Sequence, residues 1–196
     1  YNALEQARKE LNCDRIATGH TADDQTEEFF IRLIRGTNTA GLSGMQEEKG
    51  CLIRPLIHEK KETLVSFLEQ MQIDFCHDSS NDDQQFLRNR VRHLLLPLLE
   101  KEFNPSIGET VAQTRNILSE ENNYLEQITE NAFSSVVKEA EEGVNLHTNQ
   151  FKQLHTAIQR RLIENTLWKL ACKPSFKAVD SIIHLIRSLD TELHPS

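Results

Sequence analysis

The chain has 196 residues, enough for one large domain or two small ones, and its 38% hydrophobic and 27% charged residues are typical of a globular protein. A formal net charge of −8 excludes a surface that is basic all over, as general binding to nucleic acid would require. No apolar run reaches the roughly 18 residues of a membrane span, and we see no basic-then-apolar leader, so we expect no membrane partner and a cytoplasmic location. The four cysteines form no C-x-x-C pair, so we expect free thiols.

The first elements alternate between helix and strand. Asn2–Asn12 has the apolar spacing of an amphipathic helix, and Arg15–Thr18 is a short apolar strand. Thr21 and Asp24 have the spacing of a capping box, so a second helix should begin near Ala22. Helix, strand and helix in this order predict an α/β fold with a Rossmann-like parallel sheet.

Polar side chains gather where this strand passes into the second helix. His20 precedes the helix, and Asp23, Asp24, Gln25 and Glu27 lie in its first turns. The helix dipole stabilises acids at such a place in any protein. However, open α/β sheets also bind ligands at the carboxyl ends of their strands. The cluster therefore suits a metal–nucleotide complex or a cationic substrate.

The next part of the first half contains a glycine-rich segment and three short elements. The segment 36–50 is either a lid or a surface connector. We expect a strand at Cys51–Leu56 that Pro55 ends, a helix at Lys60–Gln72, and a strand at Ile73–His77.

A basic helix follows the turn residues Asp78–Asp82. The helix should span Asp83–Phe103, with Pro97 kinking it or starting a new turn. Arg88 and Arg92 are four residues apart and share a face, whereas Arg90 points elsewhere. Such a face is often simply solvated, but guanidinium groups this dense favour a contact with phosphate or another anion.

Asn104-Pro105 is the predicted domain boundary, which divides the chain into 1–104 and 105–196. The second domain should be all-helical, with helices at 107–142, 149–171 and 175–189. Trp168 and Phe176 are expected in its core rather than in a platform for stacking bases.

Three ordered motifs lie in the first half of the chain. They are GHTADDQTEEFFIRLIRG at 19–36 (followed by GLSGM at 41–45), LIRPLI at 52–57, and DSSNDDQQFLRNRVRHLLLPLLE at 78–100. Together they closely resemble the motifs of the tRNA(Ile)-lysidine synthetases, a family of PP-loop ATP pyrophosphatases. The resemblance implies a partial PP-loop domain followed by a helical domain that contacts tRNA.

The chain also departs from the pattern of that family. Thr21 replaces a second histidine, and Glu28 replaces a threonine. The phosphate loop Ser-Gly-Gly-x-Asp-Ser is absent from the sequence. We therefore expect a truncated form that does not turn over ATP alone, which an ATP–pyrophosphate exchange assay would test.

The resemblance implies a two-step ligase reaction. ATP adenylates the C2 oxygen of the wobble cytidine in the anticodon region of tRNA(Ile), and free lysine then attacks that carbon and expels AMP. Mg²⁺ is the expected cofactor, with Asp24 as its candidate ligand. The candidate catalytic residues are Asp23, Asp24 and Arg88. The candidate ATP- and substrate-binding residues are His20, Gln25, Glu27, Arg54, Asp78 and Asn81. The candidate tRNA-binding residues are Arg88, Asn89, Arg90 and Arg92.

Two other readings stay open. The first is another PP-loop tRNA-modifying enzyme, such as a tRNA thiolase, although none of the four cysteines lies in a motif. The second is a non-catalytic helical module that binds RNA or protein. The sequence does not give the oligomeric state, and a homodimer is retained as one expectation.

Overall fold

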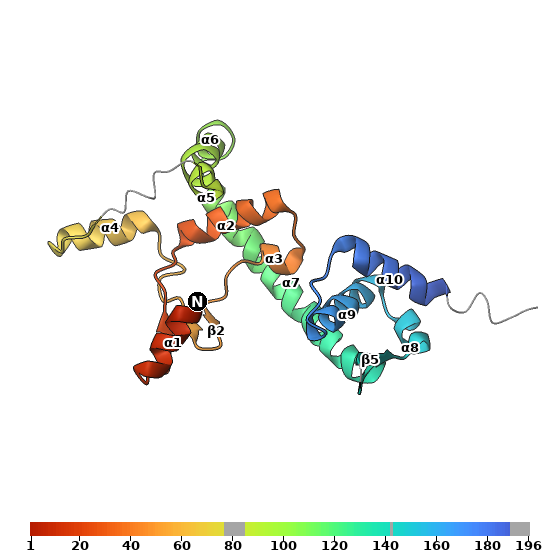
Figure 1. Cartoon of the computed structure of the whole chain (residues 1–196). Helices are drawn as coiled ribbons and strands as arrows, with labels where there is room; N and C mark the ends of the chain where they lie inside the picture. Colours follow the sequence, from red (N-terminus) through yellow and green to blue (C-terminus); the bar gives the residue numbers. More distant parts are fainter. Residues whose placement is uncertain (77–84, 142, 189–196) are drawn as a thin grey trace, which may run out of the picture. The chain divides into compact units, whose positions relative to one another are not determined.

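The computed structural model describes residues 1–76, 85–141 and 143–188 of the chain (Figure 1). The chain divides into two compact units, residues 1–120 and 121–196. The division falls within the 30-residue helix α7 (Ile107–Val136). The boundary expected at Asn104-Pro105 lies just before α7 and stays a prediction.

The first unit begins as the sequence predicts. Helix α1 (Asn2–Glu10) leads into strand β1 (Ile16–Ala17), and helix α2 (Ala22–Arg35) follows. The predicted capping box is confirmed: the Thr21 hydroxyl accepts a hydrogen bond from the Asp24 amide, and the Asp24 carboxylate accepts one from the Thr21 amide at 2.9 Å. These reciprocal bonds satisfy amides that the first turn of a helix leaves unpaired, and so fix where α2 begins.

The first unit contains a three-stranded sheet in the order β1-β3-β2. Strand β3 (Leu52–Ile53) pairs parallel to β1, with Ile16 opposite Leu52. Strand β2 (Glu48–Lys49) pairs antiparallel to β3 and was not expected from the sequence. The glycine-rich segment also contains a one-turn helix, α3 (Thr39–Leu42). The parallel β1–β3 pair and the surrounding helices confirm the α/β class.

The strand expected at Ile73–His77 is wrong over residues 73–76. Helix α4 (Lys61–Gln70) forms as predicted, but the chain then continues as irregular structure. Ile73 and Phe75 are about half exposed, so their alternating pattern does not correspond to a buried face. His77 and the turn predicted at Asp78–Asp82 lie outside the described residues.

The basic helix is a composite of three helical segments. They are α5 (Leu87–Arg90), the π-helix η2 (Val91–Leu95) and α6 (Leu96–Glu102). Residues 85 and 86 form a turn, so this helix begins later than predicted. Pro97 lies in the first turn of α6, directly after the π-helix η2, so the proline falls where the helix changes type and not in a regular α-helical stretch. Both α5 and η2 pack against α2.

The second unit is not purely helical, which corrects the prediction. After α7 the chain forms an antiparallel hairpin of β4 (Val137–Ala140) and β5 (Gly143–Leu146). The helix predicted to extend to residue 142 is therefore wrong over residues 137–141, and residue 142 lies outside the described residues. Val136 and Val137 are β-branched and buried, which favours leaving the helix for a strand.

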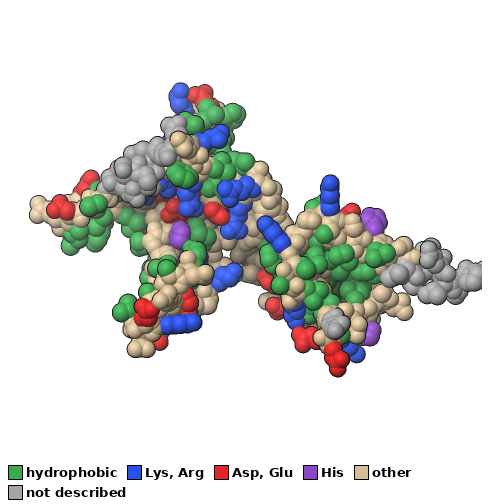
Figure 2. All heavy atoms as spheres, in the orientation of Figure 1, with side chains coloured by type: hydrophobic (Ala, Val, Ile, Leu, Met, Phe, Trp, Pro, Cys, Tyr) green, Lys and Arg blue, Asp and Glu red, His purple; other side chains and the backbone are tan. Residues whose placement is uncertain are grey.

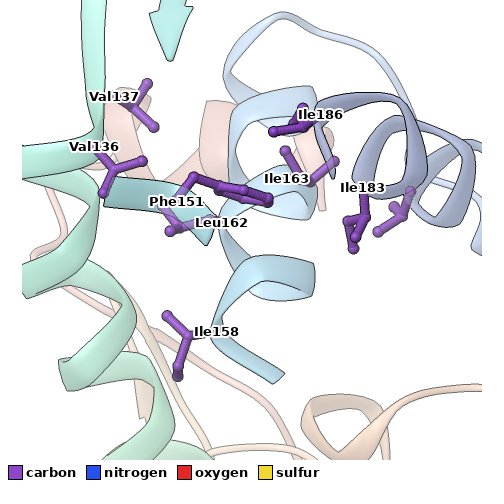
Figure 3. Close-up of a cluster of buried hydrophobic side chains, with 9 residues drawn as sticks. Val136, Val137, Phe151, Ile158, Leu162, Ile163, Ile183 and Ile186 are labelled. Atoms are coloured by element: carbon purple, nitrogen blue, oxygen red, sulfur yellow. The ribbon is translucent and has the colours of Figure 1, made fainter. Parts of the chain in front are cut away.

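Three further helices follow in the described part of the second unit: α8 (Thr148–Gln153), α9 (Thr156–Lys169) and α10 (Phe176–Ser188). The single helix predicted at 149–171 is thus divided between α8 and α9. Figure 3 shows side chains from these elements meeting in one apolar core. The buried members of this core are Val136, Val137, Phe151, Ile158, Leu162, Ile163, Val179, Ile183 and Ile186.

The two aromatic residues expected in this core lie at the surface instead. Trp168 is 60% exposed and Phe176 is 74% exposed. On α9 the inward stripe runs through Ile158, Leu162 and Thr166 at steps of four residues, and Trp168 falls off that stripe. Within the described part of the chain, no helix is long and apolar enough to cross a membrane.

Candidate active site

Two acids in the first turn of α2 make hydrogen bonds at the starts of two helices, α2 itself and α4. Asp24 closes the capping box with one carboxylate oxygen and also accepts from the Thr21 hydroxyl at 3.1 Å. Asp23 is exposed, and its carboxylate accepts a 2.7 Å hydrogen bond from the Lys61 amide at the start of α4. The two acids therefore fix the N-terminal ends of two helices at the carboxyl end of β1.

Glu27 is the centre of the charged cluster. It is 1% exposed, and its carboxylate accepts hydrogen bonds from Arg92 Nε at 2.5 Å and from Arg92 Nη2 at 3.0 Å. Arg88 Nε lies 3.3 Å from the same carboxylate. A bidentate guanidinium–carboxylate pair is among the stronger and more directional interactions in proteins. The pair thus holds the basic helix against α2 in a defined register.

Burial and charge have opposite effects on the Glu27 carboxyl. Burial raises its pKa above the ordinary value, whereas the hydrogen bonds from Arg92 act to lower it. The same hydrogen bonds raise the pKa of the Arg92 guanidinium. Glu27 is therefore a carboxyl whose charge depends on Arg92 staying in place.

Two further acids extend the cluster along α2. Arg92 Nη2 lies 3.5 Å from Asp24 Oδ1, and Arg88 Nη2 lies 3.4 Å from Glu28 Oε2. Arg88 and Arg92 thus share a face, as their spacing predicts, while Arg90 is exposed. Figure 2 shows acidic and basic side chains lying side by side on this face of the first unit.

A cavity of about 630 Å³ opens beside this cluster. Its charged lining includes Asp23, Asp24, Glu27 and Arg92, and Gly19 lines it at the end of β1. Its volume lies within the range of small-molecule sites. The position, beyond the carboxyl end of a parallel strand and at the start of a helix, is where ligands bind in open α/β sheets.

Two predicted binding residues hold the backbone of the glycine-rich segment. The Gln25 side chain is buried and both donates to the Met45 carbonyl and accepts from the Met45 amide, each at 2.9 Å. Arg54 is also buried, and its Nη1 donates to the Gln46 carbonyl at 2.6 Å. These contacts hold the segment against α2 and β3, and any role of the two residues toward a ligand stays a prediction.

The other predicted residues are placed as follows. The His20 ring lies 2.9 Å from the Thr18 hydroxyl and is half-buried beside the cavity-lining turn. Asn89 is buried within α5. Asp78 and Asn81, like Ser80, lie outside the described residues.

Sequence reasoning missed Arg115 on α7. Its Nη2 donates to the Ser43 carbonyl at 3.3 Å, its buried Nε has no hydrogen-bond partner, and burial lowers the pKa of the guanidinium. Gly44 has φ +86°, and a Cβ there would collide with Arg115. A single arginine on a long acidic helix carries no sequence signal for this contact.

The acids at the cavity could supply only some of the ligands that a bound Mg²⁺ needs. Among the described residues, no group of three or more His, Cys, Asp or Glu side chains could hold a metal ion. Mg²⁺ is commonly bound by one or two carboxylates together with substrate phosphates and water. Asp23 and Asp24, side by side at the cavity, fit that smaller requirement.

Comparisons with known proteins show which sequences this chain resembles. The family model described as a PP-loop domain matches residues 1–99. The tRNA(Ile)-lysidine synthase of Solibacter usitatus is 35% identical over 80% of the chain. The proteins of the same name from Synechocystis sp. and Gloeobacter violaceus are each 32% identical, over 96% and 93% of the chain. The aligned regions span 36%, 60% and 57% of the lengths of these three relatives.

Proposed function

This chain belongs to the PP-loop domain family, and from that membership we propose that its protein converts the wobble cytidine of an isoleucine tRNA to lysidine, using ATP and free lysine. The relatives that carry the name tRNA(Ile)-lysidine synthase support this choice of substrate. The proposal concerns the whole protein and places it in the cytoplasm, with the anticodon region of the tRNA as its partner. A homodimer is one assembly that the proposal allows.

One observation carries the proposal: acids of α2 and the Arg92 guanidinium meet at the cavity beyond β1. Asp24 and Glu27 lie on α2, and Arg92 reaches both of them from η2. Adenylation places the negative charge of a leaving pyrophosphate near the attacking cytidine oxygen, and cations stabilise that charge. Lysine brings a positive amine, which a carboxylate can hold.

We assign complementary roles to the two sides of the cluster. Arg88, whose side chain is 40% exposed, would exchange part of its contact with Glu27 for a phosphate oxygen of ATP or tRNA. Asp23 and Asp24 would bind Mg²⁺ or the lysine amine. Mg²⁺ on Asp24 and the phosphates would neutralise charge on the leaving pyrophosphate.

The test is lysine-dependent release of AMP by the full-length protein in the presence of tRNA(Ile). Asp24→Asn and Arg88→Ala should each lower the rate at least tenfold, since each removes a charge that faces the reacting groups. Lys101→Ala, at an 82% exposed position, is the control and should leave the rate unchanged. If Asp24→Asn and Arg88→Ala both retain full activity, the result would favour the alternative hypothesis of a non-catalytic module that binds RNA or protein.

A second candidate function rests on Cys76. This exposed cysteine lines the same cavity as Asp24 and Arg92. A thiol at that place suits a PP-loop enzyme that transfers sulfur to tRNA. Cys76→Ser should leave lysine-dependent AMP release intact under the first proposal and abolish modification under the second.

A further inference from the structure

The second unit carries an exposed tryptophan in an open pocket. Trp168 is the only tryptophan of the chain, is 60% exposed and takes no part in the buried apolar core. It lines a pocket of about 930 Å³ together with Asn165, one turn earlier on α9, and Phe133 of α7. An indole left at the surface contributes little to folding, so its face is available to another flat group.

Four charged side chains line the pocket, and two of them are paired with each other. Lys169 is already engaged: its ammonium lies 4.6 Å from the centre of the Phe133 ring and 3.5 Å from Glu139. Lys138 on β4 is exposed and makes no ion pair within the described residues. Glu130 completes the charged lining, which holds two carboxylates and two ammonium groups and is therefore neutral overall.

This arrangement matches the chemistry of one unpaired nucleotide. The base is flat and uncharged and stacks on an aromatic face. Its amino and ring N–H groups can donate to a carboxylate or amide, as Glu130 and Asn165 offer. The adjoining phosphate carries one negative charge, which Lys138 can meet.

We propose that the pocket around Trp168 binds an unpaired base of an RNA, with the indole as stacking partner and Lys138 as phosphate contact. The inference rests on the proposed function for its choice of RNA over other partners. It adds a contact on the second unit, separate from the acidic and basic cluster of the first.

Fluorescence of Trp168 tests the proposal directly, because no other tryptophan contributes. The 196-residue chain is titrated with a labelled single-stranded RNA of about eight nucleotides, within the range that one such binding surface covers. Binding is followed by anisotropy of the RNA label and by tryptophan emission. We expect quenching that tracks binding, and little quenching by the same RNA in a duplex, whose bases are already stacked.

Variants separate stacking from charge. Trp168→Ala should weaken binding about fivefold or more, and Trp168→Phe should weaken it less because a ring remains. Lys138→Ala should lower the slope of log affinity against log salt by about 0.7. Phe176→Ala is the matched control, an exposed aromatic residue of the same unit that does not line the pocket. Circular dichroism checks that each variant is folded.

Three outcomes would overturn the proposal. RNA binding with unchanged tryptophan emission and unchanged affinity in Trp168→Ala would place the RNA elsewhere and leave the proposed function standing. If the chain binds no RNA at all, the pocket is not an RNA-binding site. The proposed function would still be tested separately by the AMP-release assay. Loss of acrylamide access to Trp168 on raising the protein concentration alone would assign the pocket to a second copy of the chain.

Discussion

The two units bury apolar and polar side chains in different proportions. In the second unit nine buried hydrophobic residues form one core (Figure 3), and four described polar residues are buried as well (Asn122, Thr129, Gln159 and Thr166). In the first unit the described buried residues are four hydrophobic ones (Ile31, Ile57, Val91 and Val111) and six polar or charged ones (Thr21, Gln25, Thr26, Glu27, Arg54 and Asn89). Burial of apolar surface is non-directional, whereas hydrogen bonds and ion pairs fix distances and angles. Hydrogen bonds and ion pairs therefore fix the positions of the charged side chains in the first unit, and a change in one charge can disrupt that arrangement.

The first unit also leaves many hydrophobic side chains exposed at its surface. Hydrophobic side chains lie at the surface along α4 and around α6 (Figure 2). Phe67 and Met71 are more than half exposed near the end of α4, and Phe103 is 74% exposed just after α6. The apolar residues of these helices thus contribute less to burial than their spacing in the sequence predicts.

The largest effect should come from the core of the second unit. Phe151→Ala removes a ring that is 0% exposed and should cost about 3–5 kcal/mol of unfolding free energy. Urea unfolding followed by Trp168 fluorescence reports on this unit. Phe176→Ala, at a 74% exposed position, should change stability by less than about 1 kcal/mol, because the ring loses only surface contacts such as that with the Arg160 guanidinium. Equal losses in both variants would contradict the proposed difference between core and surface.

A smaller loss should follow from changing the polar centre of the first unit. Glu27→Gln keeps the size of the side chain but places an amide N–H donor against the guanidinium donors of Arg92, so one of the two accepted hydrogen bonds is lost, at about 1.5–3 kcal/mol. Circular dichroism in urea measures the loss, and Trp168 fluorescence should not shift with it. Glu28→Gln is the matched control: its side chain is 23% exposed, so the loss should stay below about 1 kcal/mol. A loss in Glu28→Gln as large as in Glu27→Gln would mean that burial is not what makes Glu27 important.

The contact between Gly44 and Arg115 should be weaker again. Gly44→Ala combines an unfavourable φ of +86° with a collision against the guanidinium, at about 1–2 kcal/mol. In an Arg115→Ala background the collision is absent and only the backbone strain remains. A double-mutant cycle should thus show coupling between the two positions. Strictly additive losses would show that the two side chains do not meet.

The weakest effect is a dependence on pH. Burial raises the folded-state pKa of Glu27 above its ordinary value, so the folded state holds a proton there over a pH range in which the unfolded chain has lost it. Stability from this group is therefore present below the unfolded pKa and is lost as pH rises through the folded pKa. The stability of the natural chain relative to Glu27→Gln should fall as pH rises through this window. Urea titrations of both proteins across the acidic range measure the difference; a rise instead would reverse the assigned direction.

Local rules explain which features could be predicted from the sequence. The capping box of Thr21 and Asp24 and the common face of Arg88 and Arg92 depend on residues within one turn of a helix, where spacing alone decides contact. The pairing of Arg92 with Glu27 was not predicted, because spacing within one helix does not show which side chains of another helix its arginines will meet.

Features that depend on distant partners could not be predicted in this way. The hairpin after Val136 forms where two valines find a core supplied by later helices. The exposure of Trp168 depends on which stripe of α9 that core selects. Gln25 and Arg54 are polar residues near the site, and nothing local distinguishes a ligand contact from their bonds to the backbone of residues 45 and 46.

Asp23 links the cavity to α4 through a single hydrogen bond from the Lys61 amide. A ligand that draws this carboxylate toward itself leaves that amide without its acceptor and loosens the first turn of the helix. Deuterium uptake at Lys61 would then report occupancy of the cavity without any label on the ligand. The carboxylate that we propose as a ligand contact would in that case also transmit the arrival of the ligand to a helix on the cavity wall.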